Sequence, residues 1–296
     1  MKEGQIVKAL AGYYYVQEKN TLHVWQCRAR GVFKNQGITP LVGDYVTFEP
    51  SANNEGTVTS LKPRLNELIR PPIANVDQAL LVFSVAEPDF STILLDKFLV
   101  HIEKANIQPV ICLTKVDLLE SPLEKYPEIK VYQGLDYPLF MVSRNHKRSL
   151  EEVEEFLRGK TTVFAGQSGV GKSSLLNAIH PAFGIETAEI SMKLGRGKHT
   201  TRHVELLALP KGGVVADTPG FSQLDFTLFE PEDLGGLFIE FNQFSPSCKF
   251  RGCLHQNEPK CIVKQAVEEG EIAEHRYRHY LQFLEEIQTE KQKRRY

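Results

Sequence analysis

A glycine-rich loop between an apolar run and a short helical pattern constrains this chain more than any other feature. The loop, Gly166–Ser173, reads G-Q-S-G-V-G-K-S and matches the phosphate-binding pattern G-x-x-x-x-G-K-[ST]. Thr161–Ala165 predicts a buried strand before it, and Ser174–Ile179 predicts a helix after it. A strand, loop and helix in this order favour a nucleotide-binding α/β domain over the alternative, a plain glycine-rich turn.

The chemistry of phosphate binding explains the residue types of this loop. Glycines let backbone N–H groups turn toward the phosphates, and the following helix points its positive end at the anion. Lys172 is expected to reach the β- and γ-phosphates, and the Ser173 hydroxyl to bind Mg²⁺. The predicted nucleotide-binding residues here are Gly166, Gln167, Ser168, Gly169, Val170, Gly171, Lys172, Ser173 and Ser174.

A second phosphate-site element follows at residues 214–220. Val214-Val215-Ala216 predicts a buried strand that ends in the D-x-x-G sequence Asp217-Thr218-Pro219-Gly220. This resembles the γ-phosphate sensor of GTPases, in which Asp217 would hold Mg²⁺ through water and the Gly220 amide would contact the γ-phosphate. The alternative is an ordinary exit from a strand into a turn.

The sequence Thr114-Lys115-Val116-Asp117 resembles the guanine-specificity motif [NT]-K-x-D. It follows the apolar run Pro109–Leu113, so we expect it at the end of a buried strand. The Asp117 carboxylate can accept both guanine N–H donors, whereas adenine offers no matching pair. The alternative is a charge cluster at a strand end. Ser143 could belong to a loop near the guanine oxygen or simply end another strand.

The order of these motifs is inverted. In ordinary GTPases the phosphate loop precedes the base motif, but here residues 114–117 precede residues 166–173, which predicts a circularly permuted domain. The chain leaving the γ-phosphate sensor then runs directly into residues 229–296. We therefore expect nucleotide state to be linked mechanically to that C-terminal segment.

The residue pattern along the chain changes twice and so predicts three domains, which agrees with 296 residues at roughly 100–200 per domain. Residues 1–72 hold short β-rich runs, among them Leu41–Phe48, and predict a small barrel. Residues 73–228 alternate strands and helices, which predicts a mostly parallel α/β sheet. Residues 229–296 contain a Cys/His cluster and the helical pattern of Ile272–Gln288, so a mostly α-helical metal-binding domain is expected.

Three of the five cysteines lie in that cluster, Cys248-x4-Cys253-x-His255-x5-Cys261. Three thiolates and one imidazole form a closed tetrahedral set for one structural Zn²⁺, with no position left for a catalytic water. Unliganded buried thiols are the alternative. Cys27 and Cys112 lie in apolar runs and are expected in the core. The odd cysteine count favours a reducing compartment over a disulfide scaffold.

A formal net charge of −2 hides charges that alternate along the chain. Residues 1–72 and 158–228 each carry +3, whereas residues 73–157 carry −6 and residues 229–296 carry −2. Two basic surfaces are therefore candidates for RNA: Arg28, Arg30 and Lys34 with Trp25 and Phe33 on the barrel, and Arg276, Arg278 and Lys291–Arg295 on the C-terminal helix. A merely solvated face and plain helix packing are the respective alternatives.

The motifs together resemble those of the RsgA (YjeQ, YloQ) family of GTPases that depend on the small ribosomal subunit. The residues that carry the resemblance are the permuted order, Gly166–Ser174, Gly195–Arg202 and Cys248–Cys261. The resemblance covers essentially the whole chain and implies an N-terminal OB-fold. It also implies a GTPase that binds the small (30S) subunit and its rRNA, acts late in subunit assembly and is stimulated by that subunit.

The resemblance also extends to hydrolysis. Phe221 follows Gly220, where many GTPases carry the Gln that orients water, so intrinsic turnover is expected to be slow. The family points to His199 as the residue that positions water, with contact to RNA or solvent as its alternative role. Thr200 or Thr201 would complete the Mg²⁺ shell, and similarity to related GTPases favours Thr201. Lys172 is the third predicted catalytic residue.

Two other functions compete with the GTPase. One is a P-loop ATPase or nucleotide kinase, against which Asp117 argues. The other is a passive RNA-binding factor with little catalysis, against which intact Lys172, Ser173 and Asp217 argue. With no apolar run approaching the roughly 20 residues of a membrane helix and no signal-peptide pattern at the start, we expect a cytoplasmic protein without a membrane partner. We also expect a monomer.

Overall fold

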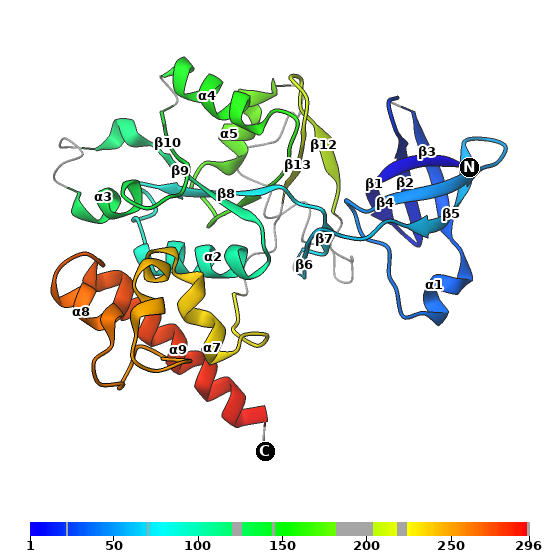
Figure 1. Ribbon diagram of the computed structural model, residues 1–296. Coiled ribbons are helices and arrows are strands. Elements are labelled where there is room, and N and C mark those ends of the chain that lie inside the picture. The colour runs from blue at the N-terminus through cyan, green and yellow to red at the C-terminus, as the bar shows by residue number, and fades with distance from the viewer. Residues whose placement is uncertain are drawn as a thin grey trace.

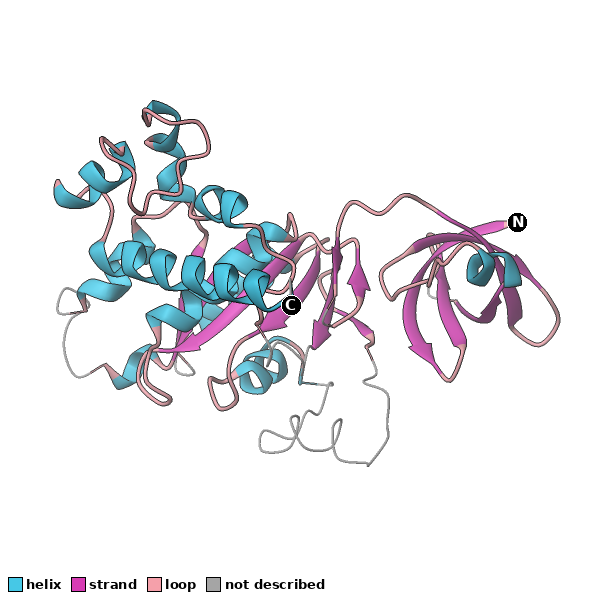
Figure 2. Ribbon diagram, turned by 90° about the horizontal axis from the view of Figure 1, so that it is seen from below, coloured by secondary structure: helices cyan, strands magenta, loops and turns pink. Residues whose placement is uncertain are grey.

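The computed structural model describes residues 1–21, 23–69, 71–119, 126–143, 146–181, 204–217 and 224–294. It contains a barrel, an α/β sheet and a helical unit; the barrel lies beyond one edge of the sheet, and the helical unit lies below it (Figure 1). Figure 2, which views the molecule from the side of the helical unit, shows the barrel standing apart beyond the edge of the sheet. The predicted fold classes are confirmed, whereas the predicted boundaries at residues 72 and 228 stay predictions.

The N-terminal unit is a closed five-stranded barrel in the order β1-β2-β3-β5-β4. Alternating side chains such as Val16, Cys27 and Phe48 point inward and are fully buried, so the predicted core position of Cys27 is confirmed. The predicted strand over Leu41–Phe48 begins later, at Tyr45, because Gly43 adopts a φ of 92° in a turn. The elements of the barrel unit are β1 (Lys2–Leu10), β2 (Tyr13–Glu18), β3 (Val24–Ala29), α1 (Gly31–Asn35), β4 (Tyr45–Pro50) and β5 (Glu55–Leu61).

A short two-stranded sheet, β6 (Glu67–Leu68) with β7 (Ile73–Ala74), joins the barrel to the rest of the chain. Arg64 and the fully buried Asp44 form a two-point ion pair, with N–O distances of 2.7 and 2.8 Å. Asn75 donates to the Gly43 carbonyl at 3.0 Å. These contacts fasten the connection to the barrel at several points, so it is not a free tether.

The central unit is a six-stranded sheet in the order β10-β9-β8-β11-β13-β12. All neighbours are parallel except β12, which pairs antiparallel with β13. Every residue of β8 and β11 is buried, as expected for strands covered on both faces. The strands are β8 (Gln78–Ser84), β9 (Gln108–Thr114), β10 (Leu139–Val142), β11 (Thr161–Ala165), β12 (Leu206–Ala208) and β13 (Val214–Asp217).

Helices cover both faces of this sheet (Figure 1). Leu95 of α2 and Tyr132 of α3 belong to the core on one face, which continues into the barrel interior. Val153 of α4 and Leu175 of α5 belong to the core on the other face, together with the fully buried Cys112. The helices are α2 (Thr92–Lys104), α3 (Pro127–Gln133), α4 (Lys147–Leu157) and α5 (Lys172–Ile179), with the short 3-10 turn η1 (Val116–Leu118) after β9.

The C-terminal unit is helical and has its own aromatic core, in which Phe238, Phe241, Tyr280 and Phe283 are fully buried. Its main element is the 21-residue helix α9, which confirms the helical pattern predicted over Ile272–Gln288. The unit comprises α7 (Pro231–Leu234), η4 (Gly235–Leu237), η5 (Ile239–Gln243), η6 (Ser245–Ser247), α8 (Ile262–Glu268) and α9 (Glu274–Arg294).

A buried ionic network attaches this unit to the sheet unit. Arg276 of α9 is 1% exposed and donates to Asp96 of α2 at 2.5 Å and to Glu240 of η5 at 2.7 and 2.8 Å. Tyr132 and His279 also bond to Asp96, each at 2.6 Å. Burial raises the pKa of the Asp96 carboxyl, but these partners, Arg276 foremost, outweigh it and hold the pKa below its usual value.

A single β-bridge joins the barrel to the edge of the sheet. Lys8 of β1 pairs antiparallel with Glu205, the residue just before β12, and their side chains form an ion pair at 3.0 Å. The two residues are 197 positions apart in the sequence. The barrel therefore contacts the chain directly after residues 182–203.

Candidate nucleotide site and metal centre

The phosphate loop leaves the buried strand β11 and enters α5, as its pattern predicted. Gly166 has a φ of 143°, and a Cβ there would overlap the Val82 carbonyl oxygen, so only glycine lets the loop lie so close to β8. Lys172 begins α5, and its Nζ donates to the carbonyls of Gly166 at 2.7 Å and Gln167 at 2.6 Å. The ammonium group thus lies within the curve of the loop, where a phosphate would be bound.

The base motif and the phosphate loop are held together by a direct contact. Thr114 ends β9, and its hydroxyl donates to the Val170 carbonyl at 2.5 Å and lies 3.2 Å from the Phe83 carbonyl. Lys115 follows in a left-handed conformation with a φ of 59°, and its ammonium bonds to the Glu87 carbonyl. Although about 50 residues separate the two motifs, the parallel strands bring them to one edge of the sheet.

A cavity of about 510 Å³ lies where the two motifs meet. Polar groups from the base motif, including Asp117, face one part of it, and the start of α5, including Ser174, faces another. Its volume falls in the usual range for small-molecule sites. The cavity is lined by Thr114, Lys115, Asp117, Leu118, Val142, Leu150, Gly171, Ser174, Leu175 and Ala178.

The apolar walls of this cavity were missed by the sequence analysis. Leu118 follows Asp117 in η1, and Leu150 comes from α4. Leu150 carries no motif signal, because an apolar residue on a helix reads as core. Of the two, only Leu118 could have been predicted as a wall residue, because it directly follows the base motif.

Ser143 directly follows β10, the strand that contributes Val142 to the cavity wall. Ser143 is 3% exposed, and its carbonyl accepts a hydrogen bond from the His146 amide at 3.1 Å. The residue thus lies at the same edge of the sheet as the base motif, and its role toward a base stays a prediction.

Apart from Lys172, the predicted γ-phosphate and hydrolysis residues are described only at the backbone of Asp217. It ends β13 opposite Phe164 of β11, so it lies beside the strand that leads into the phosphate loop. Gly220, Phe221, His199, Thr200 and Thr201 lie outside the described residues. Their predicted roles are therefore untested by this geometry.

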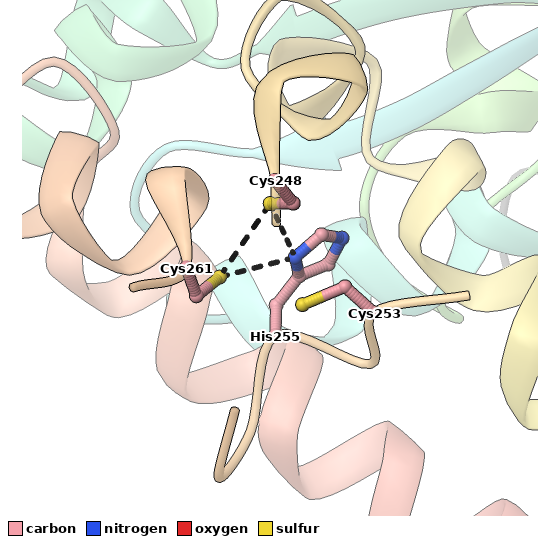
Figure 3. Close-up of side chains that lie close together, drawn as sticks. All are labelled: Cys248, Cys253, His255 and Cys261. Atoms are coloured by element: carbon pink, nitrogen blue, oxygen red, sulfur yellow. Dashed lines mark hydrogen bonds between the residues drawn. The ribbon is translucent and has the colours of Figure 1, made fainter. Parts of the chain in front are cut away.

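The predicted metal ligands converge on one point (Figure 3). Their ligand atoms all lie within 4.8 Å of one another, and His255 Nδ1 is 3.3 Å from Cys261 Sγ and 3.7 Å from Cys248 Sγ. These spacings fit a tetrahedral ion with metal–sulfur bonds of about 2.3 Å. Burial raises the pKa of the Cys253 thiol to about 12 and lowers that of His255, so only a bound cation would favour thiolates here.

The long helix α9 holds the ligand loop in place. The hydroxyl of Tyr277 donates to the His255 carbonyl at 2.7 Å, and that of Tyr280 donates to the Leu254 carbonyl at 2.6 Å. Glu258 accepts the backbone amides of Leu254 and Gln256 at 2.8 and 2.9 Å. The cluster is thus a braced site, and a metal ion fits it.

Some of the predicted RNA-contact residues are exposed in the structure, and others are buried. Arg28 and Arg30 are exposed on the barrel, where Arg28 stacks on the Tyr13 ring at 4.7 Å. Phe33 is only 5% exposed, so its prediction as part of an RNA-binding surface is wrong: it packs into the barrel core. Trp25 also packs on that core, and its ring lies 6.0 Å from that of Phe48. The side chain of Lys34 lies outside the described residues.

Arg276 is likewise unavailable to RNA. It is buried in the network with Asp96 and Glu240, so the alternative of plain helix packing holds for this residue. Arg278, two positions on, points away from the core and its side chain is 68% exposed.

Comparison with known sequences identifies the family. The sequence model of the RsgA GTPase family matches residues 61–227, and that of the RsgA N-terminal domain matches residues 3–58. The chain belongs to the RsgA GTPase family. Membership makes it a GTP hydrolase and confirms the resemblance carried by the permuted motifs.

Relatives of this RsgA chain match over nearly their whole length. The protein named "Small ribosomal subunit biogenesis GTPase RsgA 2" of Oceanobacillus iheyensis is 57% identical, covering 98% of this chain and 99% of its own. The "Small ribosomal subunit biogenesis GTPase RsgA" of Bacillus subtilis is 55% identical, with the same coverage of both chains. The match therefore includes the barrel and the metal cluster as well as the GTPase segment.

Two solved structures share the RsgA architecture. YloQ, described as a circularly permuted GTPase, is 50% identical with a TM-score of 0.83, covering 98% of this chain and 96% of its own. YjeQ from Thermotoga maritima is 40% identical with a TM-score of 0.85, covering 97% and 98%. The circular permutation predicted from motif order is thus confirmed. Among the described residues, no helix is long and apolar enough to cross a membrane.

Proposed function

We propose that this RsgA-family GTP hydrolase binds the small ribosomal subunit and its rRNA and acts late in assembly of that subunit. The observation that carries the proposal is the convergence of the base motif and the phosphate loop on one cavity. The names of its relatives, small ribosomal subunit biogenesis GTPases, supply the biological setting.

Guanine recognition is assigned to Asp117. Its carboxylate accepts the two guanine N–H donors, while Leu118 and Leu150 offer apolar surface to the faces of the base. Thr114, Lys115 and Val116 form the rest of the base motif. Gly166–Ser174 binds the phosphates. When they bind, Lys172 replaces its hydrogen bonds to the Gly166 and Gln167 carbonyls with hydrogen bonds to phosphate oxygens.

The metal assignments follow from the donor sets. Ser173, Thr201 and, through water, Asp217 would hold Mg²⁺, and Gly220 would contact the γ-phosphate. Bound Mg²⁺ supplies charge neutralisation at the β- and γ-phosphate oxygens. Cys248, Cys253, His255 and Cys261 would hold one structural Zn²⁺, since a closed Cys₃His set is typical of zinc.

Hydrolysis is assigned to a water positioned by His199, because Phe221 cannot orient one. An imidazole can orient or deprotonate water, and Lys172 stabilises the charge that develops on the γ-phosphate. We further propose the division into domains 1–72, 73–228 and 229–296, and a monomer located in the cytoplasm.

Nucleotide state is proposed to reach the C-terminal domain through the segment that follows the γ-phosphate sensor. His101 of α2 contacts the Asp225 carbonyl at 3.0 Å, and its ring lies 5.2 Å from that of Phe226. The Phe226 ring in turn lies 5.1 Å from that of Phe283 on α9. This segment therefore touches the sheet unit and the C-terminal helix at once.

GTP turnover with and without purified small ribosomal subunits tests the function. We expect slow intrinsic turnover and at least about tenfold stimulation by the subunit, with His199→Ala abolishing stimulation but retaining nucleotide binding. ATP should not compete with GTP. Absent stimulation would contradict the assembly role, and unchanged stimulation in His199→Ala would contradict that residue's assignment.

If the protein were instead a passive RNA-binding factor, the opposite results would be expected. It would bind the small subunit equally well with GTP, GDP or no nucleotide, and its turnover would stay at background. Lys172→Ala supplies the matched control, since it removes phosphate binding without touching the barrel or the metal centre.

A further inference from the structure

Strand β1 departs from regular geometry where the barrel meets the sheet. The register between β1 and β2 shifts between Ile6 and Lys8, which leaves Val7 as the extra residue of a bulge. In a regular strand Lys8 would share the face of Ile6, which is fully buried in the core. The bulge interrupts that alternation, and the Lys8 ammonium lies outside the core, 5.8 Å from the centre of the Tyr15 ring. Lys8 is thereby directed toward the sheet unit.

The chain of the sheet unit is anchored where Lys8 contacts it. Lys8 and Glu205 are partners in an antiparallel β-bridge, and their side chains form an ion pair at 3.0 Å. The residues on either side of Glu205, Val204 and Leu206, are buried and belong to the core that continues into the barrel. The start of β12 is therefore held to the barrel by backbone pairing, by apolar packing and by a pair of opposite charges.

A single strand separates this contact from the predicted Mg²⁺ site. β12 is the edge strand of the sheet and pairs with β13, which ends in the predicted Mg²⁺ ligand Asp217. Leu206 pairs with Ala216, so one step further along the antiparallel register Glu205 lies beside Asp217. In the sequence, Glu205 also follows a second predicted Mg²⁺ ligand, Thr201, by four positions. A force on the barrel therefore acts on the strand that borders Asp217.

We propose that Lys8 is a positioning residue for GTP hydrolysis: through Glu205 it holds the start of β12, and with it the end of β13, in the arrangement that binds Mg²⁺. When rRNA holds the barrel, the bridge passes that restraint to the GTPase site and contributes to stimulation of turnover. The inference rests on the proposed function, because the small subunit supplies the rRNA.

The strength of the bridge suits a contact that responds to a ligand. The side chains of Lys8 and Glu205 are 29% and 40% exposed, and exposed ion pairs change an equilibrium by roughly 1.4- to fivefold. Such a pair can form and break at little cost. Coupling between two sites is also reciprocal, so the state of the GTPase site acts on the barrel through the same bridge.

Two charge reversals and their combination test the bridge in the full-length protein at saturating small subunits. Lys8→Glu and Glu205→Lys each replace attraction with repulsion, so each should lower the ratio of stimulated to intrinsic turnover roughly two- to tenfold. The double variant Lys8→Glu/Glu205→Lys restores opposite charges and should return the ratio to within about twofold of wild type. Because Glu205→Lys adds a positive charge, weaker attraction to RNA cannot explain a loss in that variant.

A second readout needs neither the small subunit nor hydrolysis. Binding of a fluorescent, non-hydrolysable GTP analogue is measured as a function of Mg²⁺ concentration. Both single variants should raise the Mg²⁺ concentration for half-maximal effect about two- to fivefold, because the end of β13 is held less firmly, and the double variant should restore it. If the wild type is not stimulated by small subunits, the proposed function fails, whereas this measurement still decides the role of Lys8.

Lys2→Glu is the matched control. Lys2 lies on the same strand and pairs with Glu18 of the barrel at 2.9 Å, so its reversal changes the charge of β1 by the same amount without touching β12. It should leave both the turnover ratio at saturation and the Mg²⁺ dependence as in wild type.

Three results would overturn the proposal. The first is a wild-type turnover ratio and Mg²⁺ dependence in both single variants. The second is a loss that the double variant does not restore, which would indicate a direct RNA contact of Lys8 or a disturbed fold. The third is higher intrinsic turnover in the single variants, which would mean that the bridge restrains the GTPase site.

Discussion

The carboxylate of Asp117 is the group on which the choice of base depends. It lies at the edge of the cavity that the phosphate loop shares, directly after the left-handed Lys115. Asp117→Asn replaces a double acceptor with an amide that can accept only one guanine N–H. We expect GTP affinity to fall at least about tenfold, because hydrogen bonds to charged groups contribute roughly 1.5–3 kcal/mol.

The same variant should gain affinity for xanthosine triphosphate, whose additional carbonyl can accept from the new amide. Titration with fluorescent guanosine and xanthosine nucleotides measures both changes. Glu152→Gln on the exposed side of α4 serves as the control. Unchanged binding of both nucleotides by Asp117→Asn would place the base elsewhere.

Single residues were predictable where chemistry restricts the residue type. Lys172, Asp117 and the four metal ligands stand in patterns that few other functions use, and the structure brings each set together. Arg276 shows the limit. A basic residue on an amphipathic helix normally faces solvent, and its partner Asp96 lies 180 positions away, so sequence spacing held no sign of their contact.

At the level of elements, the attachment of α9 to α2 depends on a charge that is almost fully buried. Because the folded-state pKa of Asp96 is depressed, its ionised form contributes stability that is present above about pH 4, the usual pKa of an unfolded aspartate. That contribution is lost as the pH falls from there through the depressed pKa. Asp96→Asn should therefore destabilise the protein by about 3 kcal/mol near neutrality and by much less in acid.

Urea midpoints of the wild type and Asp96→Asn between pH 3 and pH 7 measure this difference. Loss of metal in acid affects both proteins, so it cancels when the two are compared. The exposed pair of Arg278 and Glu274 offers a control, because Arg278→Gln should change stability by less than about 0.5 kcal/mol. A constant difference between wild type and Asp96→Asn across the pH range would contradict the assignment.

Element type was predictable from periodicity, and element limits were less so. The buried strands β8 and β11 and the helix α9 follow their apolar patterns closely. The start of β4 does not follow its pattern. The residue pattern predicts a strand through Gly43, but the chain turns at that glycine. The inward or outward direction of Phe33 and Trp25 also depends on how the barrel closes, which the local sequence does not specify.

For the molecule as a whole, the C-terminal unit should depend on its metal more than the sheet does. Its aromatic core is distinct from the two cores of the sheet, and its ligand loop braces α9. Structural zinc contributes on the order of 10 kcal/mol in small zinc-binding domains. We expect a chelator to make residues 245–294 sensitive to protease while guanine nucleotide binding persists.

Limited proteolysis with mass spectrometry, run beside a nucleotide titration, measures both effects. Cys253→Ser should reproduce the effect of the chelator, whereas Cys112→Ser, a thiol buried in the sheet, should not make the C-terminal unit selectively sensitive. Metal analysis that finds no zinc, together with unchanged protease resistance in chelator, would contradict a structural metal.

The relative placement of the three units was beyond sequence reasoning. The barrel meets the sheet through Lys8 and Glu205, and the helical unit meets it through Arg276 and Asp96. Each contact joins residues that are more than 100 positions apart, and each depends on a pair of charges with no motif of its own. The residue pattern predicted three domains, but it did not predict how they are placed relative to one another.

The barrel lies beyond the β12 edge of the sheet, and the helical unit that carries the metal cluster lies against α2 (Figure 1). If each holds RNA, this GTPase is a bivalent ligand whose two weak contacts are joined by a structured spacer. The second contact then forms at an effective concentration on the order of millimolar, set by geometry and not by the amount of protein in the cell. The protein would then bind most tightly to a particle on which the two RNA sites have reached their final separation. It would distinguish mature from immature particles by that separation.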